Sequence, residues 1–457
     1  MASSRLDVDS LIDDRASEGV FRVSRAVFKD PAIFAAEMVS IFEGTWVFIG
    51  LESQISQPHD FFTTHIGRQP VLITRDAEGA VRGFLNSCRH RGTIVCPFKS
   101  GKKQKQHVCR YHGWAYDSGG RNLLITDQSE GQYPSAFEKE NHDLLPIARL
   151  ESYRGLIFAS LSPDVPPLEE HLGEARAFID LAVDQGTSGL EFVPGDVNYT
   201  YDGNWKLQFE NGLDFYHFAS THSSYVDISR RRPKDQAELA IVADAFGAQS
   251  EGHGTLSFER GHAVMWSVRN TPRGTGPLAY SQEALDALRS RVGDTRAKWM
   301  VRQRNLTIFP NLQIIDISTS LQLRTWRPLA ADRTEMTSHC LAPIGEEPEA
   351  RRRRIRNYED FFNPSGLATS DDNVMYEYGQ AGYDAEGDGW TQGYARGLGG
   401  APAVPHPFAR ELGLTDATGA LGSLSFGDET CFHAGYREWR RLLGAGIGAK
   451  AANAGDL

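Results

Sequence analysis

The sequence NSCRHRG at residues 86–92, followed by HVCRYHGW at residues 107–114, decides the fold of the first part of this chain. The two stretches share a pattern of one cysteine and one histidine, found at Cys88 and His90 and again at Cys109 and His112. On either side of them, short β-type runs alternate with clusters of turn residues. We therefore predict a small all-β domain over residues 45–161 that carries these four side chains on two loops.

The interleaved order Cys, His, Cys, His indicates a metal centre with two unlike halves. A Rieske [2Fe–2S] cluster needs two thiolates on one iron and two imidazoles on the other, and two Cys/His loops supply that set. A structural zinc site is the main alternative, but zinc motifs usually group their ligands as Cys pairs or as a Cys pair and a His pair. Chance proximity of unrelated residues is the remaining alternative. Gly92 and Gly113 follow the two histidines and would allow tight loops around a cluster.

A second candidate centre lies in NWKLQFENGLDFYHFASTHSSY, residues 204–225. His217 and His222 are five positions apart, which turns about 140° on a regular helix, so a helix end or irregularity is needed to bring them together. Two histidines and one carboxylate form a facial Fe(II) site with open positions. Asp214 is close enough in sequence to orient His217. The carboxylate ligand must come from elsewhere, and the SGLATSDDN stretch offers Asp371 and Asp372, between which the spacing alone does not choose.

Length and composition indicate the number of domains, the classes of partner and the location of the protein. A chain of 457 residues with 40% hydrophobic and 23% charged residues is expected to fold around two or more cores. The net charge of −11 argues against a nucleic-acid partner. Five scattered cysteines do not form a disulfide framework; Cys96, Cys340 and Cys431 are interpreted as buried thiols. No signal peptide or long apolar run is visible, so we expect a cytoplasmic protein without a membrane segment.

The domain organisation predicted from these patterns has three parts. Residues 1–44 form an N-terminal segment, helical over about 20–45, that packs on the last domain. Residues 45–161 form the all-β domain, and residues 162–457 form a mixed domain with strands and helices. The fold class is α+β.

The chain resembles the alpha subunits of Rieske-type aromatic-ring-hydroxylating dioxygenases, and is most similar to the benzoate, toluate and halobenzoate 1,2-dioxygenase branch. The similar stretches run from about residue 40 to 375 and include IFEGTWVFIGLESQI, IGRQPVLITRD, NSCRHRG, HGWAYDSGGR, YRGLIFASL, YDGNWKLQFENGLDFYH and YEDFFNPSGLATSDD.

The resemblance implies a Rieske domain and a helix-grip catalytic domain. It implies that Asp372 is the third iron ligand, and that Asp214 bridges the cluster ligand His112 of one subunit to His217 of its neighbour. An α3 trimer, often joined by small beta subunits as α3β3, would follow. A separate ferredoxin or flavin reductase would deliver electrons from NADH.

The expected reaction is cis-dihydroxylation of an aromatic ring with O2, with a benzoate-type acid as substrate. A monooxygenase, or an anthranilate- or salicylate-type oxygenase, on the same scaffold is the alternative within enzymes; an electron-transfer or zinc-binding protein is the alternative outside them. Phe215 and Ser223-Ser224 depart from the pattern of the benzoate branch and would reshape the pocket. A carboxylated substrate needs a cationic partner. The Arg230–Arg232 run is interpreted as a solvated stretch rather than that partner.

Overall fold

The computed structural model describes residues 7–231, 253–267, 282–316, 320–385, 387–400, 407–414, 420–423 and 427–453. The chain divides into two compact units. The small unit is Phe42–Leu168, and the large unit combines Met1–Ile41 with Glu169–Leu457.

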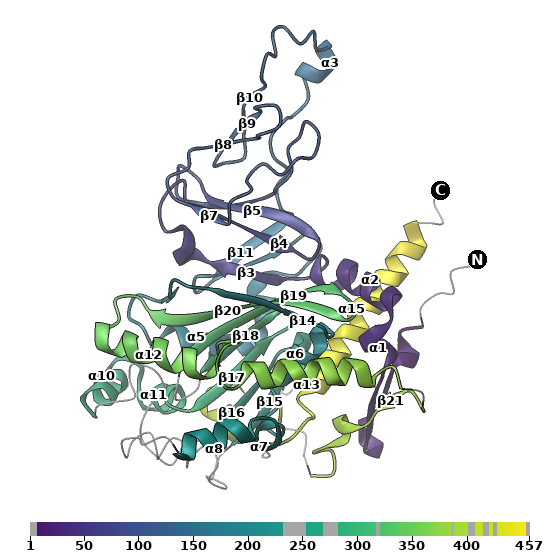
Figure 1. Ribbon diagram of the computed structural model, residues 1–457, viewed down its shortest axis with the longest axis vertical. Helices are drawn as coiled ribbons and strands as arrows, with labels where there is room; N and C mark the ends of the chain where they lie inside the picture. Colours follow the sequence, from purple (N-terminus) through teal and green to yellow (C-terminus); the bar gives the residue numbers. More distant parts are fainter. Residues whose placement is uncertain are drawn as a thin grey trace. The chain divides into compact units, whose positions relative to one another are not determined.

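The small unit is built almost entirely of short antiparallel strands (Figure 1). One sheet has the order β6-β5-β4-β7, formed by Val81–Leu85, Gln69–Arg75, Phe61–Ile66 and Ser100–Gly101. A second has the order β11-β12-β3, from Arg149–Tyr153, Leu156–Ser160 and Val47–Leu51. The third, β10-β9-β8, joins Asn122–Leu124, Ala115–Asp117 and Gln106–Val108. Short helices at Glu52–Ile55 (η4) and Ser135–Glu138 (α3) complete the unit. The all-β character predicted from the sequence is confirmed.

The predicted turns of this unit form where turn residues cluster. Asp76 closes the β5–β6 hairpin by donating its backbone N–H to the carbonyl of Ala80, and Gly79 takes a positive φ of 88°. The loop between β9 and β10 likewise contains a glycine with positive φ, Gly120 at 82°. A Cβ at Gly120 would lie 2.3 Å from the Phe84 ring, so only glycine fits there.

The large unit is organised around a nine-stranded antiparallel sheet. Its strands are β13 Leu190–Phe192, β14 Val197–Tyr201, β15 His253–Phe258, β16 Ala263–Ser267, β17 Gln303–Ile308, β18 Leu312–Asp316, β19 Leu321–Ala330, β20 Arg333–Pro343 and β22 Ala420–Ser423. The order is β13-β20-β19-β18-β17-β16-β15-β22, with β14 also paired to β20. The helices and this antiparallel sheet confirm the predicted α+β class.

Helices cover both faces of this sheet. On one face, α6 (Trp205–Asn211) contacts β19, α12 (Pro348–Phe361) contacts β19 and β20, and α13 (Thr369–Gly382) contacts β14 (Figure 1). On the other face, α5 (Arg176–Val183) contacts β17 and β18. The remaining helices are α4 Leu168–Leu172, η5 Gly173–Ala175, α7 Phe218–Thr221, α8 Ser223–Arg231, η6 Glu259–Gly261, α10 Gln282–Val292, α11 Asp294–Met300, η8 Gly393–Ala395, α14 Pro407–Glu411 and α15 Phe432–Asn453. Within the described ranges, no helix has both the length and the hydropathy required to cross a bilayer.

The N-terminal segment is more varied than the expected helix over 20–45. It contains η1 Asp9–Leu11, β1 Ile12–Arg15, η2 Ala16–Glu18, β2 Val20–Ser24, α1 Ala26–Lys29, α2 Pro31–Glu37 and a π-helical turn, η3, Met38–Phe42. The β1–β2 hairpin extends to β21 (Trp390–Thr391), a pairing that a helical pattern cannot reveal. Glu37 is fully buried and accepts hydrogen bonds from Trp205, Lys206 and Trp439. These bonds fix the start of α6, the helix that leads into the second motif.

Candidate metal centres

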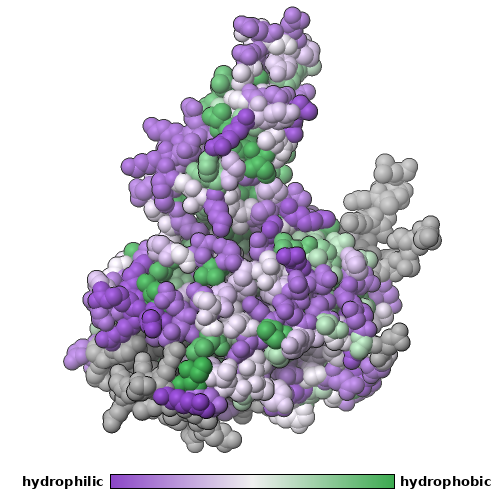
Figure 2. Space-filling view, in the orientation of Figure 1, coloured by the Kyte–Doolittle hydropathy of each residue, from purple (hydrophilic) through white to green (hydrophobic). Residues whose placement is uncertain are grey.

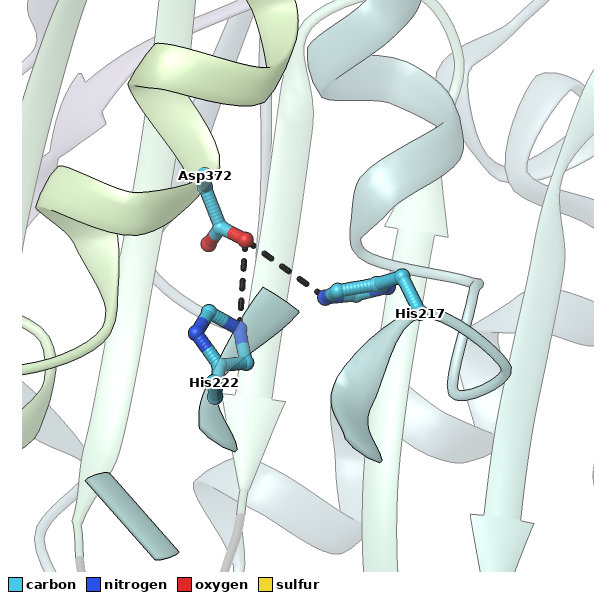
Figure 3. A group of neighbouring side chains, drawn as sticks. All are labelled: His217, His222 and Asp372. Atoms are coloured by element: carbon cyan, nitrogen blue, oxygen red, sulfur yellow. Dashed lines mark ion pairs between the residues drawn. The ribbon is translucent and has the colours of Figure 1, made fainter. Parts of the chain in front are cut away.

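His217, His222 and Asp372 converge in the large unit (Figure 3). The Asp372 Oδ1 atom lies 3.5 Å from Nε2 of His217 and 3.2 Å from Nε2 of His222. One ligand atom of each residue lies within 4.8 Å of the other two. In the part of the chain that the structure describes, no other group of three or more His, Cys, Asp or Glu side chains converges in this way.

A helix break brings the two histidines together. The short helix α7 begins after His217 and ends at His222, whose φ of −99° and ψ of 30° are not helical, and α8 starts at the next residue. The irregularity expected from the five-residue spacing is therefore present. Asp372 comes from the first turn of α13, a different part of the chain.

The outward nitrogens of both imidazoles also face carboxylates. Asp214 Oδ2 lies 3.2 Å from Nδ1 of His217, while its Oδ1 accepts the backbone N–H of Tyr216 at 2.6 Å. Asp371 Oδ2 lies 3.5 Å from Nδ1 of His222. The two adjacent aspartates thus take different places: Asp372 lies between the histidines, and Asp371 lies behind one of them. Carboxylates in the Asp214 and Asp371 positions fix the tautomer and ring orientation of metal-binding histidines.

Electrostatics favour ionised carboxylates at this site. Burial opposes charge on Asp372, but hydrogen bonds to His217 and His222 outweigh it and hold the pKa of Asp372 far below its usual range. Burial also lowers the pKa of His217, yet the hydrogen bonds to Asp214 and Asp372 reverse this effect and raise it to about 10. A cation is therefore favoured at this position, either a proton on His217 or a metal ion in its place.

The donor set fits a mononuclear Fe(II). Two imidazole nitrogens and one carboxylate oxygen on one side of a metal leave positions open for other ligands. The three side chains line a cavity with about 470 Å³ of empty space, part of it open to solvent. Its other lining residues are Asn211, Gly212, Asp214, Phe215, Phe218, Met265, Gln303, Asn305, Ile315, Arg324, Phe361 and Phe362. This mixture of aromatic walls and a few polar groups is typical of a small-molecule site.

The two Cys/His loops of the small unit have the same backbone design. In the first, Gly92 donates its N–H to the carbonyl of Cys88 at 2.8 Å, and in the second Gly113 donates to Cys109 at 2.9 Å. The N–H of each cysteine in turn donates to the carbonyl five residues later. Both glycines have positive φ, 77° and 74°, as expected from the sequence.

The four side chains on these loops meet as two pairs. Nδ1 of His90 and Nδ1 of His112 lie 3.0 Å apart, and the His90 ring stacks on Trp114. Burial raises the pKa of the Cys109 thiol, and a side-chain hydrogen bond with Cys88 raises it further. Cys88, Cys109 and Trp114 are buried in one core cluster.

This pairing fits a binuclear centre better than a mononuclear one. A tetrahedral zinc ion with Zn–S bonds of about 2.3 Å would bring its four ligand atoms within roughly 4 Å of one another. No three of these four residues come within 4.8 Å as a group. One thiol pair and one imidazole pair is the donor set that the two irons of a Rieske cluster require. The remaining thiols, Cys96, Cys340 and Cys431, are buried and unbridged, as predicted.

Comparison with known families decides the classification. Residues 193–444, more than half of the chain, match the family described as ring hydroxylating alpha subunit (catalytic domain). Residues 45–143 match the Rieske [2Fe-2S] domain. The chain belongs to the alpha subunits of Rieske-type aromatic-ring-hydroxylating dioxygenases.

The relatives of this alpha subunit include dioxygenases for aromatic acids. It is 41% identical to the alpha subunit of toluate 1,2-dioxygenase from Pseudomonas putida, over 95% of this chain and 94% of that one. It is 38% identical to the 2-halobenzoate 1,2-dioxygenase large subunit from Burkholderia cepacia, over 97% and 94%. The crystal structure of naphthalene 1,2-dioxygenase from Rhodococcus sp. bound to indole matches it with a TM-score of 0.80 at 25% identity, covering 97% of this chain and 98% of that one. The family implies a Rieske cluster and a mononuclear iron in this alpha subunit.

Sequence reasoning missed two polar residues of this site. The Asn211 amide donates to Asp372 Oδ1 at 3.1 Å and lies 3.4 Å from Nε2 of His217. Arg324 reaches the same cavity from strand β19. Asn211 lies inside the quoted motif, three residues before Asp214, and its polar side chain was the available signal. Arg324 is far from the motif in sequence, and nothing in its sequence context indicated a place in the site.

Proposed function

We propose that this alpha subunit is the terminal oxygenase component that cis-dihydroxylates a benzoate-type aromatic acid. The ring, O2, NADH and one proton would give a cis-diol and NAD⁺, so both oxygen atoms enter the product and NADH supplies the two electrons. The proposed substrate class rests on the toluate, halobenzoate and anthranilate 1,2-dioxygenase relatives, which are 36–41% identical over at least 95% of this chain.

The proposed ligands follow the geometry of the two centres. His217, His222 and Asp372 would hold the mononuclear Fe(II), and Cys88, His90, Cys109 and His112 would hold the [2Fe–2S] cluster. We assign residues 45–161 to the Rieske domain and 162–457 to the catalytic domain. Residues 1–44 would pack on the catalytic domain, a role supported by the contacts of α2 with α15.

When bound, the cluster supplies single electrons and the iron supplies oxygen activation. The chain's own residues prepare the site for that chemistry. Asp214 and Asp371 hold protons on the Nδ1 atoms of His217 and His222, so both Nε2 lone pairs point toward Asp372. Phe215, Phe218 and Phe361 surround the cavity with aromatic rings, which orient a flat substrate and limit water.

We propose that electrons cross between subunits. Asp214 is partly exposed, with 23% of its side chain accessible, so its carboxylate is available to His112 of a neighbouring copy. Apolar side chains are exposed on the small unit, including Val108 at 48%, Tyr111 at 56% and Leu124 at 54%. Figure 2 shows hydrophobic surface in the region that Figure 1 labels β8–β10. Such exposure is typical of a surface that another chain covers.

The proposed assembly is an α3 trimer, joined by beta subunits as α3β3. A separate reductase or ferredoxin would pass on electrons from NADH, and the complex would work in the cytoplasm.

The convergence of His217, His222 and Asp372 in a cavity, within a chain that also carries two paired Cys/His loops, is the observation that carries the proposal. The test is turnover of substituted benzoates by the purified holoenzyme with reductase, NADH and ¹⁸O₂. Two labelled atoms in a cis-diol product support the proposal. One labelled atom would assign a monooxygenase instead. No conversion of benzoates, with conversion of uncharged arenes, would contradict the proposed substrate class.

Iron analysis tests the centres independently of the substrate. A Rieske cluster and one mononuclear site require about three irons per chain. His217→Ala should remove one of them and leave the cluster absorbance unchanged. One zinc per chain and no iron would contradict the proposed ligands.

A further inference from the structure

The sheet of the large unit contributes one wall of the cavity that holds His217, His222 and Asp372. Met265, Asn305 and Ile315 are directly paired across β16, β17 and β18, so their side chains share one face. On β19, Arg324 is paired with Gln313, which lies two residues before Ile315 and therefore on the same face. All four of Met265, Asn305, Ile315 and Arg324 line the cavity.

Arg324 is a buried cation without a carboxylate partner. Its side chain is 3% exposed. Its Nη1 donates to Asn211 Oδ1 and its Nη2 to Thr369 Oγ1, both at 3.4 Å, and Nε has no partner. These two contacts are long for hydrogen bonds, so most of the donor capacity of the guanidinium is unused.

Other buried arginines of the large unit differ from Arg324 in this respect. Arg304 is paired with Asp316, Arg354 with Glu346 at 2.9 Å, and Arg302 with Glu411 at 3.5 Å. Among the described residues, no carboxylate lies within ion-pair distance of Arg324. The Phe362 ring lies 5.5 Å from the guanidinium carbon of Arg324 and offsets part of the cost of burying this charge. A buried cation without a carboxylate partner remains costly, so a carboxylate of a ligand would stabilise it.

A second polar group on the same wall lacks a partner. The side-chain oxygen of Asn305 is buried without a hydrogen bond, and Asn305 lines the cavity on the strand next but one to Arg324. Because amide oxygen and nitrogen positions are interchangeable by rotation, Asn305 can present either an acceptor or donors to the cavity.

We propose that Arg324 binds the carboxylate of the substrate, assisted by the amide of Asn305. This inference rests on the proposed function and adds the residue that selects aromatic acids over uncharged rings. Guanidinium and carboxylate form charge-assisted hydrogen bonds with matching planar geometry. Asn211 connects the two parts of the site, since it accepts from Arg324 and donates to Asp372. A carboxylate on Arg324 therefore brings the ring carbons nearest that group toward the metal ligands, which favours attack at positions 1 and 2.

A purely structural role would have a different signature. If Arg324 only positioned Asn211 and, through it, Asp372, its loss would weaken the binding of every substrate to the same extent. If Arg324 instead binds the substrate carboxylate, its loss should weaken the binding of aromatic acids alone. Benzoate and benzamide have nearly the same shape and differ in charge, so together they separate the two roles.

The experiment measures dissociation constants of benzoate and benzamide for the anaerobic holoenzyme by calorimetry, and KM and kcat in turnover. Arg324→Gln should raise the dissociation constant of benzoate about 10- to 100-fold, as expected for a lost charged hydrogen bond. The dissociation constant of benzamide should change less than about threefold. Arg324→Lys should restore part of the benzoate affinity, because it keeps the charge without the planar geometry. Arg327→Gln is the matched control, since Arg327 lies on the same strand but is paired with Glu335 at 2.9 Å.

Retained benzamide affinity and cluster absorbance verify that the Arg324→Gln enzyme is folded. Equal weakening of both compounds, or unchanged benzoate affinity, would overturn the inference while leaving the proposed function standing. If the wild-type enzyme does not bind benzoate, both the proposed substrate class and this inference are wrong. That result would be known before any variant is made.

Discussion

The carboxylate of Asp214 lies 3.2 Å from Nδ1 of His217, the ring nitrogen opposite the one that faces Asp372. His222 has a similar but looser arrangement, with Asp371 at 3.5 Å. The site therefore contains two carboxylate–histidine pairs, and the oxygen–nitrogen distance is shorter in the Asp214–His217 pair. Only Asp214 also accepts backbone N–H groups, from Tyr216 and His217, which lock its position.

Asp214→Asn should slow turnover about 10- to 100-fold, the usual effect of losing such a carboxylate partner. We expect the rate at which substrate and O2 reoxidise the reduced cluster to fall with it. Rates are compared per bound iron, because loss of a carboxylate behind a metal-binding histidine can also weaken metal binding. Asp371→Asn is the matched comparison and should have a smaller effect. Equal reoxidation rates in the wild type and Asp214→Asn would rule out the proposed role of Asp214.

Iron binding should depend on pH through His217. Before metal binds, the pKa of His217 is about 10, because its hydrogen bonds to Asp214 and Asp372 outweigh the effect of burial. Fe(II) needs the neutral imidazole, so it must displace one proton below that pKa. The affinity of the iron-stripped chain for Fe(II) should therefore rise about tenfold per pH unit between roughly pH 6.5 and 8.5.

Anaerobic titration with Fe(II) at several pH values measures this slope. Asp214→Asn removes one of the two carboxylates that raise the pKa of His217, so its slope should be shallower. A pH-independent affinity in the wild type would show that His217 is neutral before the metal arrives.

Glu210 should make stability fall as pH rises toward neutrality. Burial is the largest cause of its raised pKa, about 7 against an ordinary 4.5, and hydrogen bonds from Tyr436 and Tyr394 only partly oppose it. Between these two values the folded chain holds a proton that the unfolded chain has lost. The stabilisation is complete below the unfolded pKa and is lost as pH rises through about 7.

Glu210→Gln keeps an oxygen acceptor for the two tyrosines and removes the charge. Its melting temperature should therefore exceed that of the wild type at pH 8, with a difference that shrinks toward pH 5. Thermal denaturation of both holoenzymes across this range checks the prediction. Parallel stability curves would contradict it.

The two loop glycines should differ in their tolerance of alanine. Both have positive φ, which strains any side chain, but their surroundings are unlike. A Cβ at Gly113 would lie 2.6 Å from Thr126 Oγ1, whereas at Gly92 the nearest atom is 3.8 Å away. Gly113→Ala should lower cluster content more than Gly92→Ala, measured by visible absorbance and iron per chain. The double change Gly113→Ala with Thr126→Gly removes the contacting side chain and should recover part of the loss. A larger defect in Gly92→Ala would refute this explanation.

Local patterns predicted those parts of the molecule that depend on neighbouring residues in sequence. Turn residues marked the hairpins around Gly79 and Gly120, and the five-residue spacing of His217 and His222 required the helix break that is present. The choice between Asp371 and Asp372 depends on the rotation of α13 against α7. Adjacent residues on a helix point about 100° apart, and the sequence pattern does not reveal that rotation.

Features that arise from long-range pairing were not predictable in this way. The β1–β2 hairpin joins β21 across more than 360 residues, although the same region reads as helical by spacing. Arg324 reaches the cavity only because the register of β17, β18 and β19 aligns it with the wall that carries Asn305. An arginine in an alternating strand is more often exposed, so its sequence context gave no reason to select it over the Arg230–Arg232 run. Of that run, Arg231 is exposed, and the side chains of Arg230 and Arg232 lie outside the described residues.

The four Cys and His side chains proposed to hold the cluster are divided between two loops of the small unit. Each loop supplies one member of the thiol pair and one member of the imidazole pair, so neither loop alone could provide both ligands for either iron of the proposed cluster. Insertion of the proposed cluster would require both loops at once and would link residues 88–92 to residues 109–113. A chain made without iron would lack this link, and the two loops would be held together only by the protein's own contacts, such as the 3.0 Å approach of Nδ1 of His90 and Nδ1 of His112. These loops should then be more open to proteolysis than in the loaded protein.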